Sequence, residues 1–182
     1  MKRIYVLTKN PGKLQAARSA FAQFNIEINS LDLDIPEIQA DASLEIARHA
    51  AVQAAKNSDQ PVVREDHSLF IHALCIPGPY TTYIEKKISA EKLLTLIKFL
   101  GDNTGHFEVA TVLAQPSGET FEHTFQVPMT FGKKVKGEDA KGWNGIIRLL
   151  GEERAITEYP EEERLPIWNQ GYLVVAKYLA QQ

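Results

Sequence analysis

The chain opens with a strand, a short loop and a helix in close succession. A β-type run of apolar and branched residues occupies Arg3–Leu7, and the turn-forming sequence Thr8-Lys9-Asn10-Pro11-Gly12 follows it. Residues 13–24 then carry apolar side chains at helical spacing, at Leu14, Ala17, Phe21 and Phe24. Because elements joined by so short a loop must bury their apolar faces in one core, this opening predicts an α/β fold.

Similar patterns alternate along the rest of the chain. They predict strands at 25–33 and 61–64, helices at 43–56, 90–100 and 171–180, and a hairpin of residues 107–114 and 119–127. Gly101 follows a helix as a C-cap, and Ile76-Pro77-Gly78-Pro79-Tyr80 reads as a rigid loop because its prolines fix φ. Residues 132–151 look irregular. We therefore expect residues 1–182 to form a single domain with the hairpin as a lobe beside the main sheet.

Composition limits the partners of the chain. Twenty Lys and Arg against 23 Asp and Glu give a net charge of −3, which argues against binding nucleic acid through bulk charge. The single cysteine, Cys75, excludes an intrachain disulfide and a cysteine-rich zinc site. No apolar run approaches the roughly 18 residues of a membrane span, and the start does not resemble a signal peptide. We expect a cytoplasmic protein without nucleic-acid or membrane partners.

The first loop is a candidate phosphate site. Free N–H groups and the helix dipole favour an anion where a strand leads into a helix, Gly12 allows close approach, and Lys13 adds positive charge. The loop lacks the P-loop pattern, so a simple turn with a solvated lysine is the alternative.

Carboxylates form a second candidate site. Glu37 follows Pro36, and Glu65-Asp66 comes directly after the strand predicted at 61–64. Carboxylates at such strand ends commonly face a ligand crevice, and Mg²⁺ is often held by one or two of them together with substrate phosphates. A surface salt-bridge cluster with Arg64 is the alternative.

Four segments in order carry a family resemblance: Thr8-Lys9-Asn10-Pro11-Gly12-Lys13, Ile35-Pro36-Glu37-Ile38-Gln39, Glu65-Asp66-His67-Ser68-Leu69 and Ala73-Leu74-Cys75-Ile76-Pro77-Gly78-Pro79-Tyr80. Together they resemble the inosine triphosphate pyrophosphatase family, also called Ham1-like. The resemblance covers most of residues 1–115, and a weaker match continues to Gln170.

The resemblance implies a fold, an activity and a set of site residues. The α/β fold would have a long, twisted mixed sheet, two lobes and a central nucleotide cleft, commonly in a homodimer. The activity would be hydrolysis of the α–β bond of a nucleoside triphosphate to monophosphate and pyrophosphate, with Mg²⁺ or Mn²⁺. By resemblance, the phosphate-binding residues are Thr8, Asn10, Gly12 and Lys13, the metal ligands are Glu37, Asp66 and Glu65, and the catalytic residues are Asp66, Glu37 and Lys13.

The departures from the family pattern concentrate in the segments that contact the base. A Phe-Gly-Trp/Tyr-Asp segment is Lys141-Gly142-Trp143-Asn144 here, the terminal Ser-His-Arg is Trp168-Asn169-Gln170, and the lysine before it is Arg164. Replacing a cationic fork with an amide changes the hydrogen bonds offered to a base, so we expect an altered base specificity. In this interpretation Trp143 or Trp168 stacks on the base, and Asn144, Asn169 or Gln170 contacts its edge.

Other departures lie near the phosphates. A family glutamate is Ala16, a helix lysine falls at His49 or Ala50, and Asp-Ser/Thr-Gly becomes Asp66-His67-Ser68, in which we expect His67 to face solvent. Two hypotheses follow. Either the chain is a pyrophosphatase with altered specificity, or it is a weak or inactive relative that binds a nucleotide or a protein partner.

Overall fold

The computed structural model describes residues 3–137 and 142–182, which divide into two compact units. Unit 1 contains the described residues of 1–67, 109–125 and 162–182. Unit 2 contains those of 68–108 and 126–161. No helix in the described ranges is both long and apolar enough to cross a membrane.

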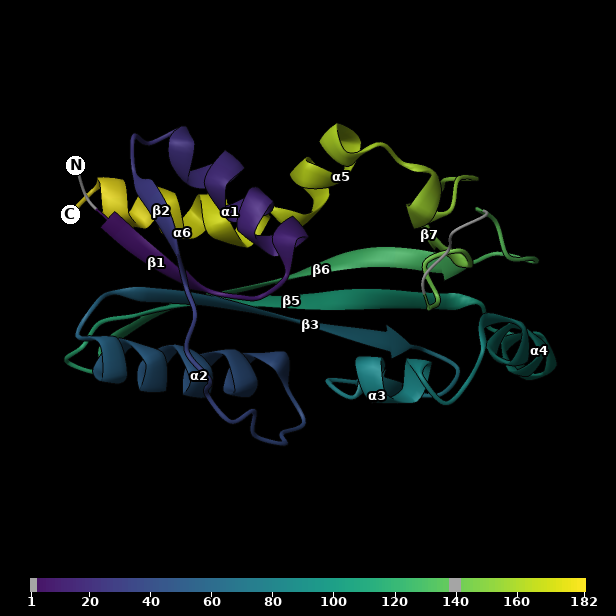
Figure 1. Cartoon of the computed structure of the whole chain (residues 1–182). Helices are drawn as coiled ribbons and strands as arrows, with labels where there is room; N and C mark the ends of the chain where they lie inside the picture. The colour runs from purple at the N-terminus through teal and green to yellow at the C-terminus, as the bar shows by residue number, and fades with distance from the viewer. Residues whose placement is uncertain (1–2, 138–141) are drawn as a thin grey trace. The chain divides into compact units, whose positions relative to one another are not determined.

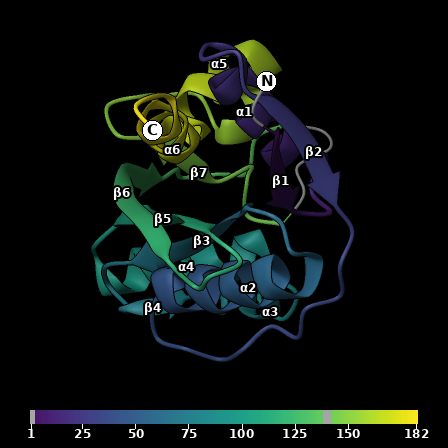
Figure 2. The same ribbon diagram turned by 90° about the vertical axis from the view of Figure 1, so that its left-hand side faces the viewer.

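The strands form a mixed sheet. They are β1 (Arg3–Leu7), β2 (Glu27–Leu31), β3 (Val62–Ile71), β4 (Ile76–Gly78), β5 (Thr104–Ala114), β6 (Thr120–Phe131) and β7 (Ile147–Leu149). Figure 1 labels all of them except β4, which Figure 2 labels. Their order is β2-β1-β3-β5-β6-β7, with β4 paired to β3. β1 pairs in parallel with β2 and β3, whereas β4 and β7 pair antiparallel with β3 and β6. The α/β class is confirmed.

Three expectations about the strands are wrong, and the first is that residues 132–151, expected to be irregular, contain β7. The hairpin strands β5 and β6 belong to the main sheet, because β3 is longer than predicted and β5 hydrogen-bonds beside it. The segment predicted as a rigid loop contains β4, in which Gly78 lies opposite Leu69. Proline is tolerated there because β4 is short and pairs only with β3 among the described strands.

The helices are α1 (Pro11–Ala22), α2 (Ser43–Ser58), α3 (Thr81–Glu85), α4 (Ala90–Leu100), a 3₁₀ turn (Ile156–Glu158), α5 (Glu161–Trp168) and α6 (Gln170–Ala180). The four predicted helices are present, whereas α3, the 3₁₀ turn and α5 were not predicted. Gly101 adopts φ 80° and closes α4, as predicted. Sequence analysis missed α5, because three glutamates and Pro166 hide any apolar period.

Unit 1 has an apolar layer on each face of β1 and β3. On one face, Phe21 of α1 and Tyr172 of α6 pack over Val63. On the other face, α2 presents a row of buried alanines to Val62. Figure 2 shows α1 and α6 together on one side of β1 and α2 on the other. Neighbouring residues of β3 therefore face different helices, which decides where its polar side chains point.

The start of α1 fixes the loop after β1. Asn10 has extended backbone angles, and its Oδ1 accepts hydrogen bonds from the amides of Gly12 (2.9 Å) and Lys13 (3.4 Å). Pro11 occupies the first helical position, where no amide donor is required. This local sequence therefore sets where the helix begins and holds Lys13 in its first turn.

Replacing the N-cap tests this local account. Asn10→Ala should lower stability by about 1 kcal/mol, or roughly 2–4 °C in Tm, because two helix amides lose their acceptor. Thermal unfolding followed by circular dichroism measures the change. Asn10→Ser, which retains a capping oxygen, is the control and should stay near the parent value; equal Tm values for all three proteins would contradict the assignment.

Candidate active site

Lys13 lies in the first turn of α1, and its side chain reaches strand β3. Its Nζ donates a hydrogen bond to the backbone carbonyl of Glu65 at 3.0 Å and lies 4.0 Å from Glu65 Oε2. The Lys13 side chain is only 20% exposed. Burial lowers the pKa of Lys13, and the charges of Glu65 and Asp66 oppose that shift. Lys13 is thus a cation attached to β3, not the solvated lysine of the alternative interpretation.

The backbone amides at the start of α1 are hydrogen-bonded to side chains of the loop before Lys13. Thr8 is buried, and its Oγ1 accepts from the Asn10 amide at 3.1 Å. Because Asn10 caps the amides of Gly12 and Lys13, those donors are already engaged. An anion at this helix start would therefore depend chiefly on the charge of Lys13.

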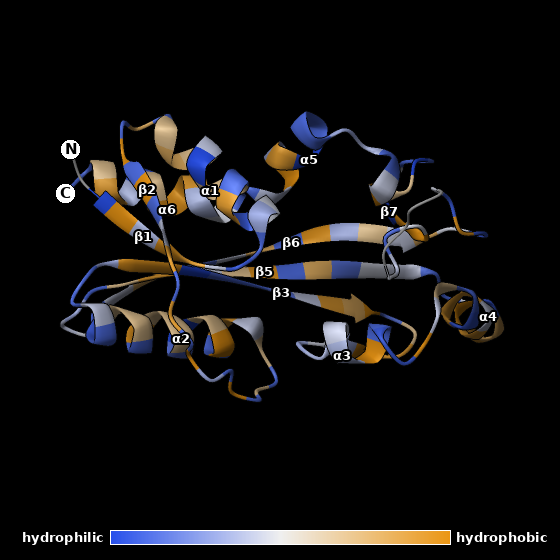
Figure 3. Cartoon of the chain, in the orientation of Figure 1, coloured by the Kyte–Doolittle hydropathy of each residue, from blue (hydrophilic) through white to orange (hydrophobic). Residues whose placement is uncertain are grey.

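Charged residues occupy consecutive positions in the middle of β3, so their side chains point to alternate faces of the sheet. Figure 3 shows a hydrophilic stretch there, before the hydrophobic end of the strand. Glu65 is 2% exposed and lies on the same side as Val63, which packs under α1 and α6. Arg64 donates to the carbonyl of Leu7 at 3.0 Å. This bond ties β3 to the end of β1, so Arg64 has a structural partner other than the carboxylates.

Asp66 is a partly buried carboxylate whose pKa is raised. Burial raises the pKa of Asp66, the positive charges of Lys13 and Arg64 lower it, and the charge of Glu37 raises it further. Glu37 itself is exposed. The two carboxylates are therefore close enough to repel one another, an arrangement that is typical of functional sites.

The donor set fits a hard cation only in part. No group of three or more His, Cys, Asp or Glu within the described ranges is arranged to hold a metal ion. Asp66 and Glu37 nevertheless form an interacting pair whose repulsion a cation would relieve. Mg²⁺ needs no more than one or two carboxylates when phosphates and waters complete its shell. The Glu65 carboxylate, only 1% exposed and beside Lys13 and His67, fits a supporting role better than a ligand role.

Contrary to our expectation, His67 does not face solvent. Its Nε2 lies 2.9 Å from Glu65 Oε2, and its side chain is 22% exposed. Its ring also packs against Trp168, with 5.4 Å between ring centroids and 30° between ring planes. The reason is strand alternation, because residues 65 and 67 of β3 point to the same face.

Trp143 and Asn144 belong to unit 2. Trp143 is 1% exposed, its Nε1 donates to the Ile88 carbonyl at 2.8 Å, and its amide donates to Glu85 Oε1 at 2.7 Å. The geometry therefore makes Trp143 a core side chain and gives no support to stacking on a base. Asn144 is exposed. Lys141, from the same motif, lies outside the described residues.

The remaining residues predicted to contact the base lie in or beside the junction of α5 and α6. Asn169 is 5% exposed, and its Oδ1 is buried without a hydrogen-bond partner. Gln170 is exposed and donates to the Ile167 carbonyl at 3.1 Å. Arg164 has a buried Nε that also lacks a partner. Unused donors and acceptors are therefore available near Trp168.

Sequence analysis missed Tyr172. This residue of α6 is fully buried, and burial together with the nearby Glu65 charge raises its pKa well above the usual value. The preceding residue, Gly171, allows α6 to approach β5 closely, because a Cβ there would collide with the side chain of Thr111 on β5. The glycine before Tyr172 is the sequence feature that could have indicated this contact. Apolar periodicity alone predicts only that Tyr172 is a core residue.

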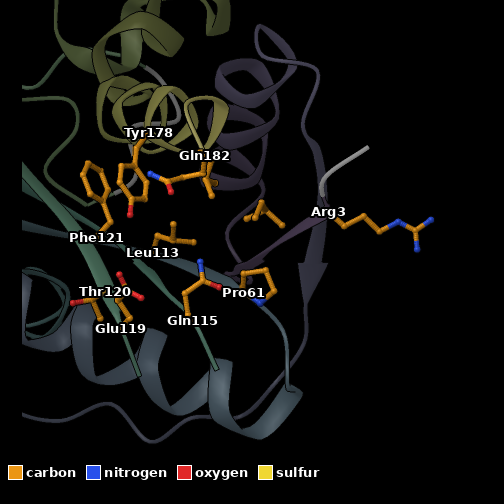
Figure 4. Close-up of a pocket in the computed structure, with 11 residues that line it drawn as sticks. Arg3, Pro61, Leu113, Gln115, Glu119, Thr120, Phe121, Tyr178 and Gln182 are labelled. Carbon is orange, nitrogen blue, oxygen red and sulfur yellow. The ribbon is translucent and has the colours of Figure 1, made fainter. Parts of the chain in front are cut away.

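A pocket lies elsewhere in unit 1. Its volume is about 370 Å³, and its walls include the stacked rings of Phe121 and Tyr178, with Arg3 and Pro61 at its edge (Figure 4). Arg3 starts β1 and Pro61 precedes β3, whereas the predicted site follows β1 and lies within β3. None of the predicted site residues lines this pocket.

The mixed sheet, the capped helix that follows its first strand and the lysine held against β3 define this chain as an α/β protein. The chain belongs to the Ham1 family, whose model matches residues 4–170.

Similar proteins support this membership. A dITP/XTP pyrophosphatase from Ignicoccus hospitalis is 32% identical over 183 residues, covering 98% of this chain and 97% of that protein. One from Methanopyrus kandleri is 32% identical, covering 91% and 88%. Solved Ham1 proteins share the fold: the Coxiella burnetii protein matches 100% of both chains with TM-score 0.84 at 19% identity, and that of Staphylococcus aureus matches 98% of both with TM-score 0.78 at 21% identity.

The raised pKa of Asp66 predicts a pH-dependent gain in stability when its charge is removed. The free-energy cost of the charged form is full above the raised pKa and disappears as the pH falls below 3.8, the ordinary pKa of an aspartate. Asp66→Asn should therefore raise Tm at pH 7.5 by up to a few °C, given about 2–4 °C per kcal/mol. The gain should vanish near pH 4.

Calorimetry in the presence of a chelator measures this difference. Asp32→Asn is the matched control, because Asp32 is 87% exposed and pairs only at the surface with Lys9. It should leave Tm nearly unchanged. A Tm for Asp66→Asn below that of the parent at pH 7.5 would show that the charge of Asp66 stabilises the fold.

Proposed function

We propose that this chain hydrolyses nucleoside triphosphates between the α- and β-phosphates, releasing a nucleoside monophosphate and pyrophosphate. The observation that carries the proposal is the attachment of Lys13 to β3 beside Asp66, whose pKa is raised. A fixed cation and a carboxylate with raised pKa are what hydrolysis of a polyphosphate requires. Relatives 32% identical to the chain are named dITP/XTP pyrophosphatases, which supports the same reaction.

Lys13 would neutralise the triphosphate. The cation sits in the first turn of α1 and is oriented by the Glu65 carbonyl, so it needs little rearrangement on binding. Thr8, Asn10 and Gly12 would support phosphate binding by shaping the loop through the cap. Because the Lys13 side chain is mostly buried, its charge acts in a weakly screened environment.

Asp66 would act on the attacking water. Its carboxylate would accept a proton from that water as oxygen attacks the α-phosphorus and the β-phosphate leaves. The raised pKa makes Asp66 a stronger base than an exposed aspartate. Asp66 and Glu37 would hold Mg²⁺ or Mn²⁺, which when bound supplies charge neutralisation and a more acidic water.

The α5–α6 junction would contact the base. Asn169 offers an unused amide oxygen and Arg164 an unused guanidinium N–H, while Gln170 lies exposed at the start of α6. An amide accepts and donates, whereas an arginine only donates. We therefore propose a range of accepted bases that differs from that of relatives with arginine at position 170.

A nucleotide screen tests the activity. The purified chain with Mg²⁺ should release pyrophosphate from at least one class among inosine, xanthosine, ordinary purine and pyrimidine triphosphates. Asp66→Asn, Glu37→Gln and Lys13→Met should each lower kcat/KM by at least about 100-fold, because each removes a proton acceptor, a ligand or a cation. Separate assays of pyrophosphate and phosphate locate the broken bond.

A surface lysine provides the control. Lys9→Met removes an exposed cation that pairs with Asp32, and its activity should stay within about twofold of the parent. If the folded parent released pyrophosphate from none of these substrates, the chain would be the binding relative of the second hypothesis.

We also propose that the protein is a cytoplasmic homodimer. Cys75 is free and exposed, which suits a reducing compartment. Unit 2 exposes Phe99 (85%) on α4, with Leu96 and Leu100 beside it on the same helix. Light scattering after gel filtration should give twice the 20.4 kDa chain mass, and Phe99→Lys should shift it towards the single chain mass. A parent protein that elutes as a monomer would contradict the dimer.

A further inference from the structure

Two residues that are far apart in the sequence meet beside Glu65. The ring of His67, on β3, packs against the ring of Trp168 at the end of α5, with 5.4 Å between centroids. On its other side, His67 Nε2 lies 2.9 Å from Glu65 Oε2. We infer that His67 and Trp168 form a positioning pair, which holds the Glu65 side chain and, through Glu65, the phosphate-binding Lys13.

Glu65 needs such support because it is a buried carboxylate. Only 1% of its side chain is exposed, so water cannot solvate its charge. Its Oε2 lies near Lys13 Nζ (4.0 Å) and nearer to His67 Nε2 (2.9 Å). Tyr172 of α6 is buried close enough for the Glu65 charge to act on it. His67 Nε2 is thus nearer to this oxygen than Lys13 Nζ is, and its position matters more than that of a surface residue.

Trp168 restricts where the His67 ring can lie. His67 is 22% exposed, so without a neighbour its ring would have room to rotate towards solvent. The tilted contact with Trp168, at 30° between planes, closes that direction. In this arrangement Trp168 acts through His67, and its ring face is engaged by the imidazole.

Lys13 connects the pair to the reaction. Its Nζ is bonded to the carbonyl of Glu65, the same residue whose carboxylate faces His67. Glu65 Oε2 also lies 4.0 Å from Lys13 Nζ, so a displaced carboxylate changes the attraction that holds the cation, and it does so whatever base the nucleotide carries. This independence from the base rests on the proposed function. It distinguishes a positioning role of Trp168 from direct stacking of Trp168 on a base.

Variants of the pair test the inference. His67→Ala and Trp168→Ala should each lower kcat/KM by about 10- to 100-fold, by the same factor for every accepted base, since small displacements of a binding cation have effects of this size. The double variant should be no worse than either single variant, because both break one chain of contacts. Trp168→Phe should restore most of the activity by replacing the ring contact.

A second aromatic pair in unit 1 supplies the control. Phe121 and Tyr178 stack with 3.9 Å between centroids, in the pocket at the start of β1 and β3. Tyr178→Ala removes a similar contact without touching Glu65, and kcat/KM should stay within about twofold. Loss of activity equal to that of Trp168→Ala would show a general effect of unpacking and overturn the inference.

Two readouts do not depend on turnover. Calorimetry with inorganic tripolyphosphate should show weaker binding in His67→Ala and Trp168→Ala, and unchanged binding in Tyr178→Ala. Tryptophan fluorescence should change in His67→Ala, while in a Trp168→Phe background the same substitution should change nothing, because Trp143 lies buried in unit 2. If the parent cleaves no triphosphate but these two results hold, the proposed activity fails and the positioning role stands.

Other outcomes would overturn the pair. A loss in Trp168→Ala that differs from base to base, with tripolyphosphate binding intact, would place Trp168 against the base. Additive losses in the double variant would show that the two residues act independently. Fluorescence that is unchanged in His67→Ala would show that the rings do not meet in solution.

Discussion

The burial of Glu65 in the middle of β3 is the constraint on which the site depends. A carboxylate that is 2% exposed in an apolar unit must be met by cations and donors. Its Oε2 lies 4.0 Å from Lys13 Nζ on α1 and 2.9 Å from His67 Nε2 on β3 itself. One buried carboxylate therefore links α1 to β3, beside the lysine that we propose for phosphate binding.

The site keeps groups that a purely structural core would avoid. The pKa of Asp66 is raised by burial and by Glu37, and that of Lys13 is lowered by burial, so both charged forms are held at a cost. The apolar layers around Phe21 on one face of β3 and the alanines of α2 on the other supply the stability that permits this. Such a balance is common where function requires charges away from water.

Local patterns predicted most of the elements and part of the site. Helical spacing identified α1, α2, α4 and α6, and Gly101 closes α4 as its position indicated. The segment at Ile76–Gly78 was misjudged, because proline rules describe local stiffness and not pairing with β3. The acidic helix α5 was missed because its sequence has no apolar period. Lys13 and Asp66 were predicted, but only the structure shows how Lys13 is held.

The sequence by itself determined the strand, the Asn10 cap and the helix that presents Lys13, because those depend on residues within a few positions of one another. It also determined that Glu65 and Asp66 are adjacent and therefore point to opposite faces of β3. Only the tertiary structure decided which face is buried, that Trp143 is a core residue of unit 2, and that His67 meets Trp168. Those outcomes depend on which distant segments pack together, and no local period encodes that choice.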